Sequence, residues 1–152
     1  MAEIKTAHLF TTTLRVGQSQ PVGKTPGGER LVVPVLDGTF EGDRIRGTVL
    51  PGGSDWILNR PDGALQLNVR LVLKTDDGAL IGVTYSGLRH GPADVLEKLW
   101  RGEEVDPALY YFRVAMLFET ASDKYAWLNR IVAVGTGTRR PDGPIYDVFE
   151  VL

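Results

Sequence analysis

Cysteine is absent from the 152 residues of this chain. Disulfide bridges, thiol nucleophiles and cysteine-ligated zinc or iron–sulfur centres are therefore excluded. The two histidines, His8 and His90, lie far apart in the sequence and share no evident acid, which argues against a serine-type triad and a histidine-rich metal site. We expect no metal and no cofactor, and the lack of cysteine suits a reducing cytoplasm.

Long apolar runs and an excess of one charge are also missing. No stretch approaches the roughly 20 apolar residues that a membrane span needs, and residues 1–5 lack the apolar run of a signal peptide. The formal net charge is -2, with acids interspersed among the basic residues, so no basic stripe could neutralise a phosphate backbone. We therefore expect a cytoplasmic protein that binds neither membranes nor nucleic acid.

Turn-forming residues recur at short intervals, and the segments between them mostly alternate between apolar and polar side chains. This rhythm is typical of an antiparallel β-barrel or sandwich. We expect strands over residues 6–16, 30–35, 40–50, 56–59, 65–74, 79–86, 109–119, 125–135 and 145–151. A turn is expected at Asp37-Gly38, a polar loop over 17–29, and one short helix between Gly91-Pro92 and Gly102. With no linker or repeat, residues 1–152 are expected to form a single domain.

The most informative local segment is residues 51–56, Pro-Gly-Gly-Ser-Asp-Trp, in which a double glycine precedes Asp55 and Trp56. Glycine permits tight turns and the close approach of another molecule, so the segment is suited to a ligand site. An ordinary turn between two strands has the same composition. Both interpretations are open for this segment alone.

Polar residues occupy one face of a middle strand. In residues 65–74 the odd positions from Leu65 to Leu73 are apolar, whereas Asn68 and Arg70 lie on the other face. A turn at residues 76–78 predicts that Asn68 and Arg70 lie near Tyr85 on the returning strand, on a shared face. A polar alternate face is also what the outer surface of a half-exposed sheet shows.

The late hairpin has a similar pattern. Arg113 and Glu119 share a face of the first strand of this hairpin. If the chain folds back near residues 122–123, Trp127 lies opposite Glu119 and Asn129 lies opposite Leu117. Arg113 lies six residues from Glu119, roughly 20 Å along a strand. Only barrel curvature could bring either side chain near Arg70 or Asp55.

Six sequence blocks together carry a family resemblance. They are residues 37–42 (DGTFEG), 51–56 (PGGSDW), 75–79 (TDDGA), 111–113 (YFR), 118–120 (FET) and 125–130 (YAWLNR). In this order they resemble the bacterial family called domain of unknown function 3237, over nearly the whole chain. Asp37-Gly38 stands where a Gly-Gly turn is expected, and Met116-Leu117 is more apolar than usual. The resemblance implies a closed antiparallel β-barrel, similar to allene-oxide-cyclase-like or lipocalin-like barrels, and a homo-oligomer, but it supplies no reaction.

Our leading hypothesis is a cofactor-independent lyase or isomerase that acts on a small carbonyl-containing or aromatic metabolite inside an all-β barrel. A Michael-type addition or elimination needs a base, donors to an oxyanion and a dry cavity. The candidate catalytic residues are Asp55, Glu119, Arg70 and Tyr85, with the two acids as bases. The candidate ligand-binding residues are Trp56, Asn68, Arg113, Trp127 and Asn129, of which Asn129 could also donate to an oxyanion.

Two alternatives use the same residues differently. The barrel could bind a small hydrophobic ligand without transforming it, or it could be a structural subunit with a filled interior. The carboxylates discriminate between enzyme and carrier. An acid buried in an apolar cavity has a raised pKa and suits proton transfer, whereas an exposed or arginine-paired acid suits recognition.

Overall fold

A computed structural model describes residues 2–152 of the chain. Its strands are β1 (Thr6–Val16), β2 (Gln20–Thr25), β3 (Gly28–Glu41), β4 (Arg46–Val49), β5 (Gly53–Asn59), β6 (Leu65–Thr75), β7 (Leu80–His90), β8 (Tyr111–Glu119), β9 (Ala133–Arg140) and β10 (Gly143–Val151). Its helices are α1 (Ala93–Trp100) and two short 3-10 turns, η1 (Pro107–Leu109) and η2 (Ala126–Arg130). No helix within residues 2–152 has both the length and the apolar character that crossing a bilayer requires.

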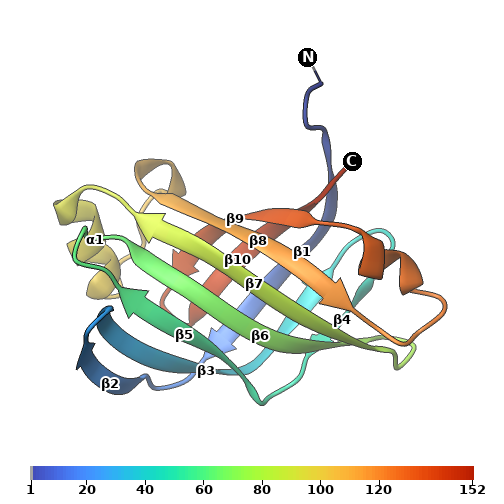
Figure 1. The fold of residues 1–152 in the computed structure, drawn as a ribbon, viewed down its shortest axis with the longest axis horizontal. Coiled ribbons are helices and arrows are strands. Elements are labelled where there is room, and N and C mark those ends of the chain that lie inside the picture. The colour runs from blue at the N-terminus through green and yellow to red at the C-terminus, as the bar shows by residue number, and fades with distance from the viewer. Residues whose placement is uncertain (1) are drawn as a thin grey trace.

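The strands form one antiparallel sheet that closes into a barrel, as expected (Figure 1). Neighbouring strands pair from β6 through β7, β8, β9 and β10 to β1, and β1 also pairs with β3, which closes the ring. β4 and β5 follow one another between β3 and β6 and share one of the eight positions around the barrel. β2 extends from β3 alone.

The two-residue alternation of the strands divides inside from outside. In β6, Leu67, Val69, Leu71 and Leu73 are buried, while Arg70 and the other even positions are exposed. Because the barrel is closed, buried here means directed into the lumen. The same alternation in β8 buries every second residue from 112 to 118.

Four expectations about individual segments are wrong. Residues 40–50 are not one strand, because β3 continues to Glu41 and β4 begins at Arg46. Asp37-Gly38 is not a turn: β3 runs through it, and Gly38 instead permits close contact with β1, since a Cβ there would lie 2.5 Å from the Thr13 carbonyl oxygen. The loop over 17–29 contains β2. Residues 125–135 are not one strand, because η2 occupies 126–130 and β9 begins at Ala133.

The end of the barrel that is remote from α1 is packed solid. Phe10 contacts Phe40 and Phe118 edge to face, with ring centroids 5.7 and 6.2 Å apart. All three rings are buried. Such an aromatic cluster fills this part of the lumen with closely packed rings.

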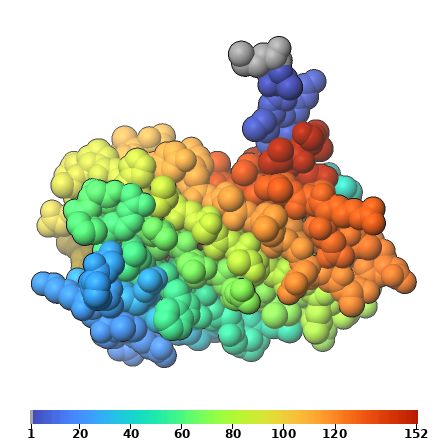
Figure 2. Space-filling model, in the orientation of Figure 1, coloured from blue at the N-terminus to red at the C-terminus, as the bar shows by residue number. Residues whose placement is uncertain are grey.

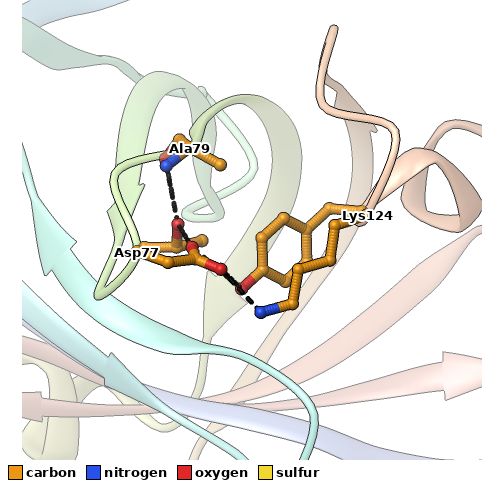
Figure 3. Close-up of polar contacts among 5 residues, drawn as sticks. Asp77, Ala79 and Lys124 are labelled. Carbon is orange, nitrogen blue, oxygen red and sulfur yellow. Dashed lines mark hydrogen bonds and ion pairs between the residues drawn. The ribbon is translucent and has the colours of Figure 1, made fainter.

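Asp77 ties together the loops that cover this packed end (Figure 3). Its carboxylate accepts hydrogen bonds from Lys124 Nζ at 2.6 Å, Thr75 Oγ1 at 2.5 Å and Tyr125 Oη at 3.1 Å. The Thr75 hydroxyl in turn accepts the Ala79 N–H at 2.8 Å. The hydrogen bonds from Lys124 and Thr75 hold the pKa of Asp77 well below its usual range. The β6–β7 turn is thereby fixed to the segment that leads into η2.

The packed end predicts a strong destabilisation on truncation. We expect Phe10→Ala to lower the free energy of unfolding by about 3–5 kcal/mol, because it removes a buried ring and leaves a cavity. Chemical denaturation followed by circular dichroism measures the change. Leu80→Ala, at a side chain that is 53% exposed, is the control and should have little effect. Equal losses in the two variants would contradict this division between core and surface.

Candidate functional site

A cavity of about 290 Å³ occupies the lumen at the end nearest α1. Most of its wall is apolar and comes from strands around the whole barrel and from α1. The apolar lining residues are Leu14, Val16, Leu31, Val33, Val35, Ile57, Leu65, Leu67, Leu99, Trp100, Phe112 and Pro144. The larger polar side chains on the wall are Asp55, Tyr85, Arg89, Arg139 and Tyr146. An apolar chamber with a few convergent polar groups is typical of a small-molecule site.

Asp55 is directed into this cavity by the double-glycine turn. Gly52 adopts a φ of 106°, and Gly53 lies so close to β6 that a Cβ would be 2.5 Å from the Arg70 carbonyl oxygen. The turn thus presses β5 between β3 and β6, where Asp55 pairs with Val33 and Val69. Alternation then places Asp55 inside and Trp56 outside.

The carboxylate of Asp55 is half-buried in the wall of the cavity. Its Oδ1 atom accepts the backbone N–H of Asn68 at 3.1 Å. Burial raises the pKa of Asp55 from 3.8 to about 6, against the opposing effects of that hydrogen bond and of the Arg89 charge. Near neutral pH, a carboxyl group with this pKa is present in both its protonated and its ionised form. It can therefore both accept and donate a proton, which suits proton transfer.

Two tyrosines lie beside Asp55. The rings of Tyr85 and Tyr146 meet edge to face with centroids 5.4 Å apart, and both side chains are buried. Burial raises the pKa of each phenol well above its usual value. Both therefore remain neutral at physiological pH and keep their O–H groups, and the two hydroxyl groups also interact with each other.

Arg89 and Arg139 complete the polar wall, and the sequence analysis missed both. Nε of Arg89 and Nη1 of Arg139 are buried without a hydrogen-bond partner among residues 2–152. Burial, followed by the neighbouring charge of Arg139, lowers the pKa of Arg89. Both residues lie beyond the strand ends expected at 86 and 135. Continuing the alternation from Tyr85 along β7 by two inward positions would have found Arg89.

Four of the sequence candidates lie on the outer surface of the barrel. Asn68, Arg70, Arg113 and Glu119 are exposed. The expectation that Arg70 and Asn68 share a face with Tyr85 is wrong: Tyr85 pairs with Val69, so the even residues of β6 face the opposite way. Asn68 still reaches the site, through its backbone N–H to Asp55.

The remaining three candidates are also outside the cavity. Trp56 points outward and is 51% exposed. Trp127 lies in η2 with the Arg44 guanidinium 4.2 Å from its ring centroid. The Asn129 side chain accepts the Thr120 N–H at 2.8 Å and donates to the Thr120 carbonyl at 3.0 Å. The expected pairing of Trp127 and Asn129 with β8 is wrong because η2 is not a strand. Of the nine sequence candidates, the cavity brings together Asp55 and Tyr85.

Comparison with known proteins decides the family. The family model described as "Protein of unknown function (DUF3237)" matches residues 4–151. The chain belongs to this family. The resemblance inferred from the six sequence blocks is thereby confirmed, and the common barrel follows from it.

Bacterial relatives share the fold over their full length. The chain is 40% identical over 149 residues to a UPF0311 protein of Rhodopseudomonas palustris, covering 98% of this chain and 97% of the relative. The crystal structure of a conserved protein of unknown function from that organism superposes with a TM-score of 0.96 at 39% identity, covering all of both chains. A β-barrel-like protein of Acinetobacter baumannii gives 0.87 at 38% identity, covering 100% of this chain and 98% of the other.

A more distant relative carries an enzyme name. The hydroalkoxylation enzyme of Penicillium herquei is 29% identical over 128 residues, which cover 84% of this chain and 70% of the relative. The crystal structure of an enzyme from the same fungus superposes with a TM-score of 0.76 at 23% identity, covering 100% of this chain and 97% of that one. The structural likeness at this identity establishes the shared barrel fold.

The raised pKa of Asp55 predicts a cost in stability. The folded chain keeps the Asp55 proton up to about pH 6, whereas the unfolded chain releases it near 3.8, so stability falls as pH rises between these values. Two pKa units correspond to about 3 kcal/mol. We expect Asp55→Asn to be more stable than the wild type at pH 8 by up to that amount, with the difference vanishing near pH 4.

Urea denaturation at a series of pH values measures this effect. The asparagine amide can still accept the Asn68 N–H, so the backbone contact survives the substitution. Asp76→Asn, in the exposed β6–β7 turn, is the matched control. A stability difference between Asp55→Asn and wild type that stays constant from pH 4 to pH 8 would refute a buried, weakened acid at this position.

Proposed function

We propose that this barrel is a cofactor-independent acid–base enzyme that adds the O–H bond of a substrate hydroxyl across a carbon–carbon double bond of a small carbonyl-containing or aromatic metabolite, or catalyses the reverse elimination. The observation that carries the proposal is Asp55, the only carboxylate among residues 2–152 that lines the cavity, whose pKa burial raises to about 6. An isolated acid in an apolar chamber is suited to exchanging a proton with a bound molecule.

The fungal relative supports the reaction class. A hydroalkoxylation is the addition of an O–H bond across a carbon–carbon double bond, and the Penicillium herquei protein is named for that activity. The bacterial relatives carry no assigned reaction. Such an addition needs a base and hydrogen-bond donors to an oxyanion, and the residues that line this cavity include a carboxylate and two phenols.

One carboxyl group is sufficient for the addition, because it can first remove the proton and later return it. The Asp55 carboxylate takes the proton from the substrate hydroxyl, and the oxygen forms a bond to one carbon of the double bond. The π electrons move to the other carbon, where a conjugated carbonyl delocalises them as an enolate. Asp55, now a carboxylic acid, returns the proton to that carbon, so no oxidant, reductant or cofactor is consumed. The elimination is the same sequence in reverse.

The two phenols assist through hydrogen bonding. Tyr85 and Tyr146 keep their protons because burial raises their pKa values. Their O–H groups can donate to the carbonyl oxygen on which negative charge develops. Donors that are fixed before the reaction and kept from bulk water are the strongest source of such stabilisation.

The alternative is a carrier that binds the same molecule unchanged. The apolar lining of the chamber favours the binding of an apolar ligand, whether or not a reaction follows. Asp55 would then accept a hydrogen bond and transfer no proton. Turnover measurements separate the two functions.

The test is conversion of a panel of molecules that carry both a phenol and a double bond conjugated to a carbonyl group, such as 2′-hydroxychalcone. Chiral chromatography distinguishes enzymatic product, enriched in one enantiomer, from the racemic background. We expect Asp55→Asn to reduce turnover by about 10²–10⁴-fold, the usual contribution of general acid–base catalysis, with ligand affinity retained. The rate of the wild type should rise with pH through about 6, because the first step needs the carboxylate.

Asp76→Asn is again the control and should match the wild type. Wild-type rates in Asp55→Asn would remove this carboxyl group from the mechanism. Tight binding of the panel with conversion no faster than background in the wild type would favour the carrier.

A further inference from the structure

We infer that the ligand of the lumen is an apolar molecule bearing one anionic oxygen group, a carboxylate or a phenolate, which Arg89 and Arg139 hold. This inference rests on the proposed function only in taking the same cavity as the ligand site. It adds the chemical class of the ligand and two specificity-determining residues.

The cavity wall carries a net positive charge. The lining residues include two guanidinium groups and one carboxylate, so the wall carries an excess positive charge even when Asp55 is ionised. None of the ion pairs within residues 2–152 involves Asp55, Arg89 or Arg139. A cation in a low-dielectric chamber is costly unless an anion accompanies it. An anionic ligand supplies the missing charge.

The two arginines also have hydrogen-bond donors without acceptors among residues 2–152. Nε of Arg89 and Nη1 of Arg139 are buried and bond to no acceptor in the described chain. Buried polar groups are almost always satisfied, and the exceptions call for a specific cause. An anionic oxygen accepts charge-assisted hydrogen bonds from guanidinium groups, and these are stronger than bonds between neutral groups.

The barrel also fixes the backbone from which the two arginine side chains extend. The Arg89 guanidinium lies 5.8 Å from the centroid of the buried Phe112 ring. The backbone N–H of Arg139 donates to the Tyr110 hydroxyl at 2.9 Å. Since Arg89 is two inward positions nearer to α1 than Tyr85, the anionic end of the ligand would face α1 and its reacting part would face Asp55.

A pair of probes with the same apolar body tests the inference. We expect 2-naphthoate to bind the wild-type protein at least tenfold more tightly than the neutral 2-naphthamide in calorimetric titrations. Arg89→Met and Arg139→Met keep an unbranched side chain but remove the charge and the donors. Each should weaken naphthoate binding at least tenfold while changing naphthamide binding little. Arg46→Met, at an exposed position in β4, is the matched control and should bind like the wild type.

A second probe distinguishes the two oxygen acids. The phenolate of 4-nitrophenol is yellow, so capture of the anion at pH 6 appears as an increase in its absorbance on adding protein. An increase that Arg89→Met abolishes identifies a phenolate site, whereas tight naphthoate binding without it identifies a carboxylate site. Both outcomes support an anionic oxygen ligand.

Equal affinity for naphthoate and naphthamide would overturn the inference, as would wild-type naphthoate binding in both methionine variants. These readouts are binding constants and do not depend on turnover. The acid–base proposal fails separately, if Asp55→Asn turns over the phenol panel at the wild-type rate. The two failures are therefore distinguishable.

A different observation, on the outer surface, carries a second proposal. We propose that the outer face of β8 and its neighbours forms a two-fold interface with a second copy of the chain. Leu117 and Val132 are 59% and 50% exposed there. Shallow hollows of about 580 and 450 Å³ lie beside Ala115 on this face. The broad face toward the viewer in Figure 2 includes β6, β7 and β8.

The charges on β8 are arranged for self-pairing. Arg113 and Glu119 lie three residues to either side of Met116, on the same outer face as Ala115 and Leu117. A two-fold axis across β8 at residue 116 sets Arg113 of each copy opposite Glu119 of the other, and each Leu117 opposite Ala115. Neither charged residue forms an ion pair within residues 2–152. Facing sheets keep their strands within about 30° of each other, so the long side chains can meet.

Charge exchange tests this interface by sedimentation equilibrium. We expect a dimer for the wild type, monomers for Arg113→Glu and Glu119→Arg, and a restored dimer for the double exchange. Lys24→Glu, at an exposed position in β2 and away from β8, is the control for charge reversal alone. A monomeric wild type, or a double exchange that remains monomeric, would overturn the proposal.

Discussion

Closure of the sheet is the constraint on which the rest of the structure depends. Because β1 pairs with both β10 and β3, the sheet has an enclosed lumen, and alternate residues of each strand are committed to it. Successive residues of a strand point to opposite faces of the sheet, so a shift of one position along the chain moves a side chain from the lumen to the solvent. Asp55 and Trp56 are neighbours in the chain, yet the first lines the cavity and the second lies outside.

The lumen combines two regions with different tasks. Buried aromatic rings and the Asp77 network hold the end that is remote from α1. The other end remains hollow and gathers ionisable groups that are costly to bury. The well-packed half stabilises the barrel and thereby offsets the cost of a weakened acid and two unpaired arginine donors in the other half.

The double-glycine segment links local structure to this division. The sequence left open whether it was an ordinary turn or part of a ligand site, and the structure shows that the turn is what delivers Asp55 into the lumen. Gly53 brings β5 against β6, which in turn presents the Asn68 N–H to the carboxylate. A backbone donor on the neighbouring strand cannot be recognised from side-chain types, and the sequence analysis therefore assigned Asn68 the wrong contact.

The sequence by itself determined the strands with clear alternation, the helix, the antiparallel barrel and the family, because these follow from local periodicity and from ordered sequence blocks. It also singled out Asp55 and Tyr85. Only the tertiary structure decided which face of each strand lies inside, since a polar alternate face has the same pattern whether it meets solvent or ligand. Arg70 and Arg89 illustrate the difference: both are arginines on paired strands, but the closed register places Arg70 outside and Arg89 on the wall of the cavity.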